Sequence, residues 1–450
     1  MIPPEIGGKI IFGCSTLARI WILINASARS ALDNPTADKP QPRIPRNLIA
    51  VSLGSFFTDI SSEMIVYLLP LFLTNVLGAQ TAVVGLIEGV AESTASLTRL
   101  ISGWLSDKLG KRKGLTVFGY SLSAVAKPLF LLANTWPLVL LLRFFDRLGK
   151  GIRTAPRDAL VADSVRTDNR GYSFGLHRAA DTAGATIGLA IAAVVTYAAG
   201  ASAMKLTAAT FHTVVWLSIL PGILGVVSLV VIAREVPPIL KPKPMGEPGS
   251  PEKITGAAVR QYNPRLVGFF LVVALFTLGN SSDAFLVLRA QNRGLSVFDV
   301  MLAIFIMNVV YTIVSIPAGQ RSDKIGRGKV LVTGWLVYGL VYLGFALTGA
   351  SWQIWVLYAL YGLYYAMVEG TARAYVADLS VPESRGTAYG IFNAAVGIMA
   401  FPASLIAGIL WQGVFGWQGL GPSAPFFFGS AMALVAVVLT IFWLPRLAKE

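Results

Sequence analysis

Acidic and basic side chains occur at helical spacing inside stretches that are otherwise apolar. Asp59 and Glu63 are four residues apart in one stretch, and Arg143 and Arg147 repeat that spacing in another, with Asp146 between them. Residues four apart lie on one face of a helix. Desolvation favours a neutral carboxylate and a neighbouring arginine favours the charged form, so such an acid can exchange a proton when its surroundings change. We predict proton exchange on Glu63, with Asp59 as second candidate, Arg143 and Arg147 as their partners, and Asp146 holding the arginines when those acids are neutral.

Further polar side chains in apolar stretches are candidates for contact with a ligand in a cavity. They are Glu88, Glu92, Lys127, Asp181, Asp283, Tyr361, Tyr365 and Glu369. Tyr361, Tyr365 and Glu369 share one helix face, and tyrosine rings beside a carboxylate suit an aromatic or cationic ligand. Two alternatives stay open. Buried acids and bases also neutralise one another to fix helix packing, and tyrosines also anchor helices at a membrane surface.

Other kinds of chemistry find little support in the sequence. The single cysteine, Cys14, excludes an internal disulfide and a cysteine-based metal site. His177 and His212 are far apart in the sequence and make a weak case for a metal. Neither a nucleophile–base signature nor a Walker-type phosphate loop occurs. We therefore expect no catalytic residue, no metal and no cofactor, with a proton gradient as the energy source.

The composition indicates a protein whose solvent is lipid. Of the 450 residues, 55% are hydrophobic and 13% are charged, whereas soluble domains carry about 25% charged residues. A soluble chain this apolar would aggregate. The net charge of +14 would suggest a nucleic-acid partner in a soluble protein. Here membrane topology explains that charge better, and we expect no nucleic acid.

About 20 apolar residues are needed to cross a bilayer as a helix. Twelve stretches meet this need: 48–77, 81–104, 114–134, 136–158, 171–198, 210–232, 263–288, 297–317, 329–348, 352–377, 386–411 and 424–445. The longest polar loop separates them into halves of six. The predicted organisation is an N-terminal cytoplasmic or interfacial extension at 1–46, a six-helix bundle at 47–232, a cytoplasmic linker at 233–262 and a second bundle at 263–450.

Lysines and arginines concentrate in the loops on one side of the predicted spans. The opposite loops hold only Lys205, Arg289 and Arg293. Because cytoplasmic loops carry the excess of these residues, both termini are predicted to be cytoplasmic. The expected location is the cytoplasmic (inner) membrane, with multiple passes.

The two halves repeat one another. The segment 103–113 reads G-W-L-S-D-K-L-G-K-R-K and the segment 319–329 reads G-Q-R-S-D-K-I-G-R-G-K, each between the second and third span of its half. A weaker echo pairs Ser61-Ser62-Glu63 with Ser281-Ser282-Asp283, in the first span of each half. Internal repeats of this kind indicate two pseudo-symmetric bundles.

On these loop motifs, the chain from 48 to 446 resembles the major facilitator superfamily. The resemblance implies an all-α multi-pass membrane protein, with twelve transmembrane helices in two pseudo-symmetric six-helix bundles around a central cavity. It also implies a small-molecule substrate, a monomer, and a cytoplasmic gate closed by the acids of the motif. The gate residues that it indicates are Gly103, Asp107, Lys108, Gly110, Arg112, Gly319, Asp323 and Gly326.

Two further segments bear on transport. Arg147, followed by Gly151, resembles the basic fourth-helix motif of proton-linked members, with Arg143 as the alternative motif arginine. The fifth helix has Gly184 and Gly188 without the proline usual in drug–proton antiporters. We predict a proton-coupled secondary transporter of a small organic solute, with efflux by antiport favoured. The alternatives are an uncoupled or symport-type importer and a non-transporting membrane receptor with the same fold.

Overall fold

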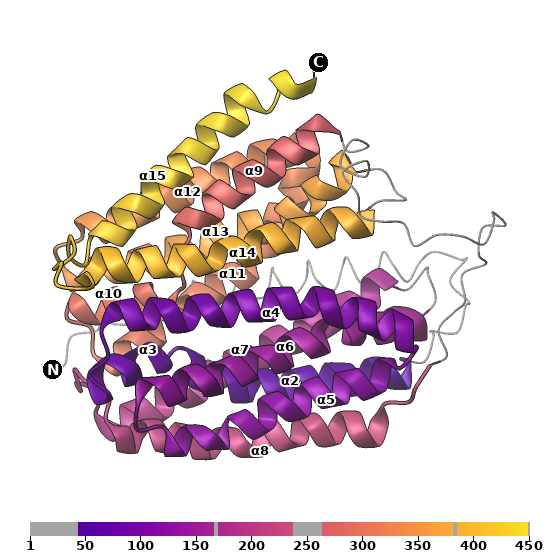
Figure 1. Ribbon diagram of the computed structural model, residues 1–450, viewed down its shortest axis with the longest axis horizontal. Helices are drawn as coiled ribbons and strands as arrows, with labels where there is room; N and C mark the ends of the chain where they lie inside the picture. Colours follow the sequence, from indigo (N-terminus) through magenta and orange to yellow (C-terminus); the bar gives the residue numbers. More distant parts are fainter. Residues whose placement is uncertain (1–43, 166–169, 237–262, 381–384, 449–450) are drawn as a thin grey trace, which may run out of the picture. The chain divides into compact units, whose positions relative to one another are not determined.

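The computed structural model describes residues 44–165, 170–236, 263–380 and 385–448. The predicted extension at 1–46 and the linker at 233–262 lie almost wholly outside the described residues. All regular elements that the structure describes are helical (Figure 1). The first half contains α2 (Arg46–Val66), α3 (Leu69–Leu71), a π-helical turn (Phe72–Val76), α4 (Thr81–Leu109), α5 (Arg112–Ala126), a 3-10 turn (Pro128–Leu132), α6 (Trp136–Ser164), α7 (Arg170–Gly200) and α8 (Ala208–Ile232). The second half contains α9 (Pro264–Gly279), α10 (Ala284–Asn292), α11 (Val297–Ile325), α12 (Arg327–Leu347), α13 (Ser351–Leu379), α14 (Arg385–Gln412), α15 (Ala424–Val438), a π-helical turn (Leu439–Trp443) and a 3-10 turn (Arg446–Ala448).

Twelve helical segments of the described chain have the length of a membrane span. Nine of them are long and apolar enough to cross a membrane by length and composition. The other three, α4, α6 and α13, have 29 residues each and carry more charges. The twelve-helix architecture in two halves predicted from the sequence is therefore confirmed, and the three charged helices are the ones that supply most of the candidate site residues.

Each half has its own helix pairs, and a smaller set of pairs joins the halves. In the first half, α2 packs on α7 and α8, and α6 packs on α4 and α5. In the second half, α13 packs on α11 and α12, while α15 packs on α12 and α9. The halves meet chiefly where α4 lies along α14 (Figure 1). A smaller contact joins α7 to α11.

The motif segments are helical almost to their ends, so the loops are shorter than the repeat suggests. Helix α4 continues through Leu109, and only Gly110 and Lys111 separate it from α5. Gly110 has φ 62° and Gly326 has φ 98°, a conformation that glycine adopts without a steric penalty. We call the end of the bundle that carries these two turns the motif end, and the other end the far end.

The seventh predicted span is broken, contrary to the unbroken helix expected over 263–288. Helix α9 ends at Gly279, and α10 begins at Ala284. The intervening sequence is Asn-Ser-Ser-Asp, whose short polar side chains compete for backbone hydrogen bonds. Ser282 Oγ indeed accepts from the Ala284 N–H at 3.3 Å. The break places Asp283 directly before the start of a new helix, α10.

Two glycines of α7 explain why it lies so close to α2. A Cβ at Gly184 would overlap the carbonyl oxygen of Phe56, and a Cβ at Gly188 would come within 2.5 Å of the Ile60 carbonyl oxygen. The segment that lacks the antiporter proline thus serves backbone-to-backbone packing, as small residues do between membrane helices.

We expect Gly184→Ala to lower the thermal midpoint of the purified protein, because overpacking at a rigid contact costs about 1–3 kcal/mol. Gly175→Ala on the same helix is the control, since nothing lies within 4 Å of a Cβ built there. Tryptophan fluorescence during heating would measure both. Equal midpoints for the two variants would show that α2 and α7 can separate without loss.

Candidate functional site

A cavity of about 370 Å³ lies between the two halves, and polar side chains from both line it. The first half contributes most of its charge, with α2, α4 and α6 each supplying titratable groups. These lining residues are Glu63, Tyr67, Glu88, Glu92, Arg143, Arg147 and Lys150. The second half adds Asp283 and Tyr365, together with Asn280 and three serines. We call this space the central cavity.

Arg143 and Arg147 of α6 are buried and held by acids from within the first half. Arg143 Nη2 lies 3.0 Å from Glu88 Oε2, and Arg147 Nη2 lies 2.9 Å from Asp146 Oδ2. The Asp146 carboxylate also reaches Arg143 at 3.6 Å, while Arg147 reaches Glu92 at 3.8 Å. Buried charges of this kind persist because each has an opposite charge at contact distance.

In this structure these arginines do not contact Glu63 or Asp59; Asp146 holds them, which is the arrangement predicted for the state in which those two acids are neutral. Arg143 and Arg147 lie against α4, whose acids are nearer than those of α2. No ion-pair partner lies within 4.0 Å of the Glu63 carboxylate in the described part of the chain. The same holds for Asp59, which does not line the central cavity. Glu63 is thus the acid of α2 that a solute in the cavity can reach.

Asp283 faces the central cavity from the opposite half and is held by tyrosine hydroxyls. Tyr361 donates to Oδ1 at 2.9 Å, and Tyr365 donates to Oδ2 at 3.2 Å. Tyr361 is fully buried and does not line the cavity, whereas Tyr365 does. No base lies within 4.0 Å of this carboxylate among the described residues. A negative charge on Asp283 is therefore supported by hydroxyl groups and not by a cation of the protein.

Lys127, predicted to line the cavity, is instead enclosed in the first half. Its side chain is buried, and Nζ donates to Ser61 Oγ at 2.9 Å and lies 3.4 Å from the Thr58 carbonyl oxygen. It follows the end of α5 and stands just before Pro128, so it ties that end to α2. The sequence shows that Lys127 lies in an apolar stretch, but it does not show that α2 is the helix packed against it.

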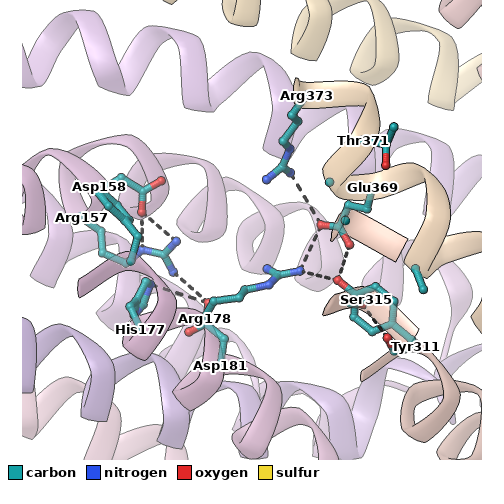
Figure 2. A pocket seen from close by; sticks show the side chains of 14 residues that line it. Arg157, Asp158, His177, Arg178, Asp181, Tyr311, Ser315, Glu369, Thr371 and Arg373 are labelled. Atoms are coloured by element: carbon teal, nitrogen blue, oxygen red, sulfur yellow. Dashed lines mark hydrogen bonds and ion pairs between the residues drawn. The ribbon is translucent and has the colours of Figure 1, made fainter. Parts of the chain in front are cut away.

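A second pocket, of about 360 Å³, lies nearer the motif end and contains two of the acids predicted to line the cavity, Asp181 and Glu369 (Figure 2). Arg178 of α7 crosses to the second half, where Nη2 lies 3.0 Å from Glu369 Oε1. Tyr311 donates to the other oxygen of the same carboxylate at 2.7 Å. Asp181 stays within the first half, 3.9 Å from Arg157. Arg178 and Glu369 thus form an ion pair between the halves.

The motif acids pair inside their own halves. Arg112 contacts Asp107 at 2.8 Å and Asp163 at 2.6 Å. In the second half, Arg327 contacts Asp378 at 2.8 Å and Asp323 at 3.5 Å. Each of these arginines therefore ties the motif segment to another helix of the same bundle.

The glycines and the lysine of the motif have different surroundings. A Cβ at Gly103 would lie 3.3 Å from the Cβ of Ala155, so the glycine lets α4 approach α6 closely. Gly319 has open space where a Cβ would stand. Lys108 lies over the Trp104 ring, with Nζ 5.0 Å from its centroid.

Hydrogen bonds join the two halves at the far end. Gln291 Nε2 donates to Asn75 Oδ1 and to the Met204 carbonyl oxygen, both at 2.7 Å. Thr81 donates to Gln412 Oε1 through its N–H at 2.9 Å and its hydroxyl at 3.1 Å. The halves are thus held together more extensively here than at the pocket of Figure 2.

Several side chains in these two spaces are absent from the predicted site. Lys150 and Tyr67 line the central cavity, and Arg178 and Tyr311 form the contact between the halves. Tyr67 could have been found, since it lies four residues after Glu63, directly after the end of α2. Within the described ranges, no group of three or more His, Cys, Asp or Glu side chains could hold a metal ion.

Comparisons with known proteins agree on one family. The family model described as Major Facilitator Superfamily matches residues 51–288 and 269–450. An MFS-type transporter of Methanocaldococcus jannaschii is 36% identical over 406 residues, which cover 89% of this chain and 95% of that protein. Multidrug resistance protein MdtG of Escherichia fergusonii is 22% identical over 330 residues, covering 70% of this chain and 76% of that protein. The solved structure of a POT family transporter in complex with 5-aminolevulinic acid covers 91% of this chain and 98% of its own, with a TM-score of 0.73 at 14% identity.

We expect Asp146→Asn to destabilise the protein strongly, because it leaves two buried guanidinium groups short of negative charge. Removing one partner of a buried pair costs about 3–5 kcal/mol. Asp158→Asn on the same helix is the control, since its ion pair with Arg157 is partly exposed and such pairs contribute about 0–1 kcal/mol. Thermal midpoints in detergent would compare them. A midpoint for Asp146→Asn no lower than that of Asp158→Asn would contradict the network.

Proposed function

Since the chain belongs to the major facilitator superfamily and is therefore a multi-pass membrane transporter rather than an enzyme, we propose that it exchanges protons for a small organic solute. The solute moves across the cytoplasmic membrane by alternating access, outward from the cell. The observation that carries the proposal is Glu63, an acid in the central cavity with no basic partner within 4.0 Å among the described residues. An acid already paired with an arginine would hold its charge and could not exchange a proton readily.

The charge pattern around Glu63 supports exchange on this residue rather than on its neighbours. Glu88 contacts Arg143 and Glu92 faces Arg147, so both carboxylates already have a basic partner in the cavity wall. Lys150 lines the same cavity and has no carboxylate at ion-pair distance within the described residues. A solute that enters or leaves changes the electrostatic environment of Glu63, and this is the physical link between solute and proton.

The contacts between the halves support alternating access. At the far end they are hydrogen bonds among amides, a threonine and backbone carbonyls. At the motif end, Arg178 joins Glu369 and Tyr311. Two sets of contacts at opposite ends of one cavity can be broken in turn. The lysines and arginines of the motif-end loops favour a cytoplasmic position for that end.

The outward direction is the finer part of the proposal. It draws on the similarity to a protein named for multidrug resistance. The glycine pair in α7, without a nearby proline, argues the other way, so proton-linked uptake of a solute is the second candidate. Both directions use the same acid, and they differ in the side from which solute must be supplied.

We expect Glu63→Gln to abolish proton movement that accompanies solute transport, because a side-chain amide does not take up a proton near neutral pH. Purified protein would be reconstituted in liposomes that enclose a pH-sensitive dye, and solutes would be added to either side. Asp299→Asn is the control, since Asp299 caps α11 at its start and lies outside the cavity. Solute-driven proton flux that persists in Glu63→Gln would remove Glu63 from the mechanism.

Cross-linking at the motif end is expected to arrest transport. In a Cys14→Ser background, Arg178→Cys and Glu369→Cys would be combined and treated with a bifunctional maleimide, which would tie the halves together. Arg112→Cys with Asp163→Cys, a charge pair inside one half, is the matched control. Flux is expected to fall only in the first pair, relative to the same protein before cross-linking. Equal flux before and after cross-linking of that pair would rule out opening at this end.

A further inference from the structure

The central cavity has more acids than bases within contact of its walls. Glu63, Glu88, Glu92 and Asp283 line it, against Arg143, Arg147 and Lys150. Asp146 stands behind the arginines and contacts both of them, and Lys127 is a further base near it, so these two do not change the balance. With every group ionised, the lining carboxylates exceed the lining bases by one. An uncompensated charge in a membrane-spanning bundle is costly, so the excess calls for positive charge from outside the protein.

Arg143 and Arg147 are not free to bind an anionic solute. Arg143 already contacts Glu88 and Asp146, and Arg147 contacts Asp146 and Glu92. An anionic solute would have to displace these carboxylates, which are covalently part of the wall and would then face one another. Glu88 Oε1 adds to this imbalance, since it is buried in a residue that is 4% exposed and has no hydrogen-bond partner within the described residues.

The two lining acids without a basic partner stand on opposite walls, at equivalent places in the two halves. Glu63 and Asp283 end the repeated Ser-Ser-acid triplets of the first span of each half, and both line the central cavity. Neither has a base within 4.0 Å in the described part of the chain. The sequence repeat thus becomes, in the folded protein, a pair of acids that face one space.

Aromatic rings surround the acid of the second half. Tyr365 and Tyr67 line the cavity, and Tyr361 and Tyr365 direct their hydroxyls to the Asp283 carboxylate. A carboxylate beside tyrosine rings is an environment in which a cationic group is favoured by charge and by the ring faces. Glu63 differs, because it lines the wall that also carries the α6 bases.

We propose that the solute of the central cavity is a monovalent organic cation, whose charged nitrogen is held by Asp283 among Tyr67 and Tyr365. Glu63 takes the proton that is exchanged. The cation and the proton occupy the cavity in turn, as exchange requires, and each brings one positive charge, so the cavity carries the same net charge in both loaded states. The assignment rests on the proposed transport function and adds to it the class of substrate and separate roles for the two acids.

Binding to the purified full chain in lipid nanodiscs tests the assignment without any need for flux. The probes share a phenyl ring and a short chain and differ in charge: phenethylamine as cation, 3-phenylpropanoate as anion, phenylalanine as zwitterion and 2-phenylethanol as neutral compound. Benzyltrimethylammonium is added because its charge does not depend on pH. Displacement of bound radiolabelled benzyltrimethylammonium, and the thermal midpoint with each probe, would be measured.

The two cations are expected to bind and the other three compounds to bind at least about tenfold more weakly, a difference of about 1.4 kcal/mol. Asp283→Asn should weaken cation binding by about tenfold or more, as expected for a lost charge-assisted contact. Asp299→Asn should leave it unchanged. The discrimination among probes by the unaltered chain is informative even if Asp283→Asn does not fold.

Protons should compete with benzyltrimethylammonium, so its binding should strengthen as pH rises, and this dependence should be lost in Glu63→Gln. The groups that face Glu63 across the cavity stay in place in that variant, and they are Glu88, Glu92, Arg143, Arg147, Lys150 and Asp283, with Asp59 on its own helix.

Tighter binding of the anion, the zwitterion or the neutral compound than of the cations would overturn the assignment. So would unchanged cation binding in Asp283→Asn, or the binding of none of these probes by folded protein. Cation binding that depends on Asp283, without proton flux in liposomes, would support the substrate class and count against the proposed proton coupling. Proton flux driven only by the anion would leave coupling in place and overturn the class.

Discussion

The pairing of two buried arginines with acids of the same half is the constraint on which the central cavity depends. Arg143 and Arg147 lie almost fully inside the protein, where an unmatched guanidinium would cost several kcal/mol. Glu88 reaches across from α4 to satisfy one, and Asp146 serves both. These contacts fix α4 against α6, and α4 in turn supplies the surface on which α14 of the second half packs.

That network divides the charges of the cavity into two kinds. The first kind are acids and arginines that pair with one another in the cavity wall, such as Glu88 with Arg143. Others, Glu63, Lys150 and Asp283, have no opposite charge at contact distance among the residues that the structure describes. Only the second kind can respond to a solute or a proton, because a change in the first kind would leave a buried charge alone. Because the two arginines of this network are paired with other acids, they leave Glu63 and Asp283 without a basic partner.

The helices and their repeat could be predicted from the sequence because both are local or periodic properties. Apolar length marks each span, and the motif segments recur at corresponding places in the halves. Partners across the bundle could not be predicted. Spacing shows which face of a helix holds Lys127 or Glu369, but not that Ser61 or Arg178 lies opposite. The break before Asp283 is missed because the apolar residues on both sides keep the mean hydropathy of the whole span high, although the short polar run at 280–283 is visible in the sequence.

The arginines of the ion pairs within each half are less exposed than the arginine of the pair that joins the two halves. At the motif end, Arg112 and Arg327 each form ion pairs with acids of their own half, so these pairs link helices within one bundle. The Arg178–Glu369 pair joins the halves with an arginine side chain that is 57% exposed, and exposed pairs contribute only about 0–1 kcal/mol. Separation at this end therefore costs little and leaves the internal pairs intact. Alternating access needs bodies that hold their shape while the contacts between them break, and this division of the ion pairs provides them.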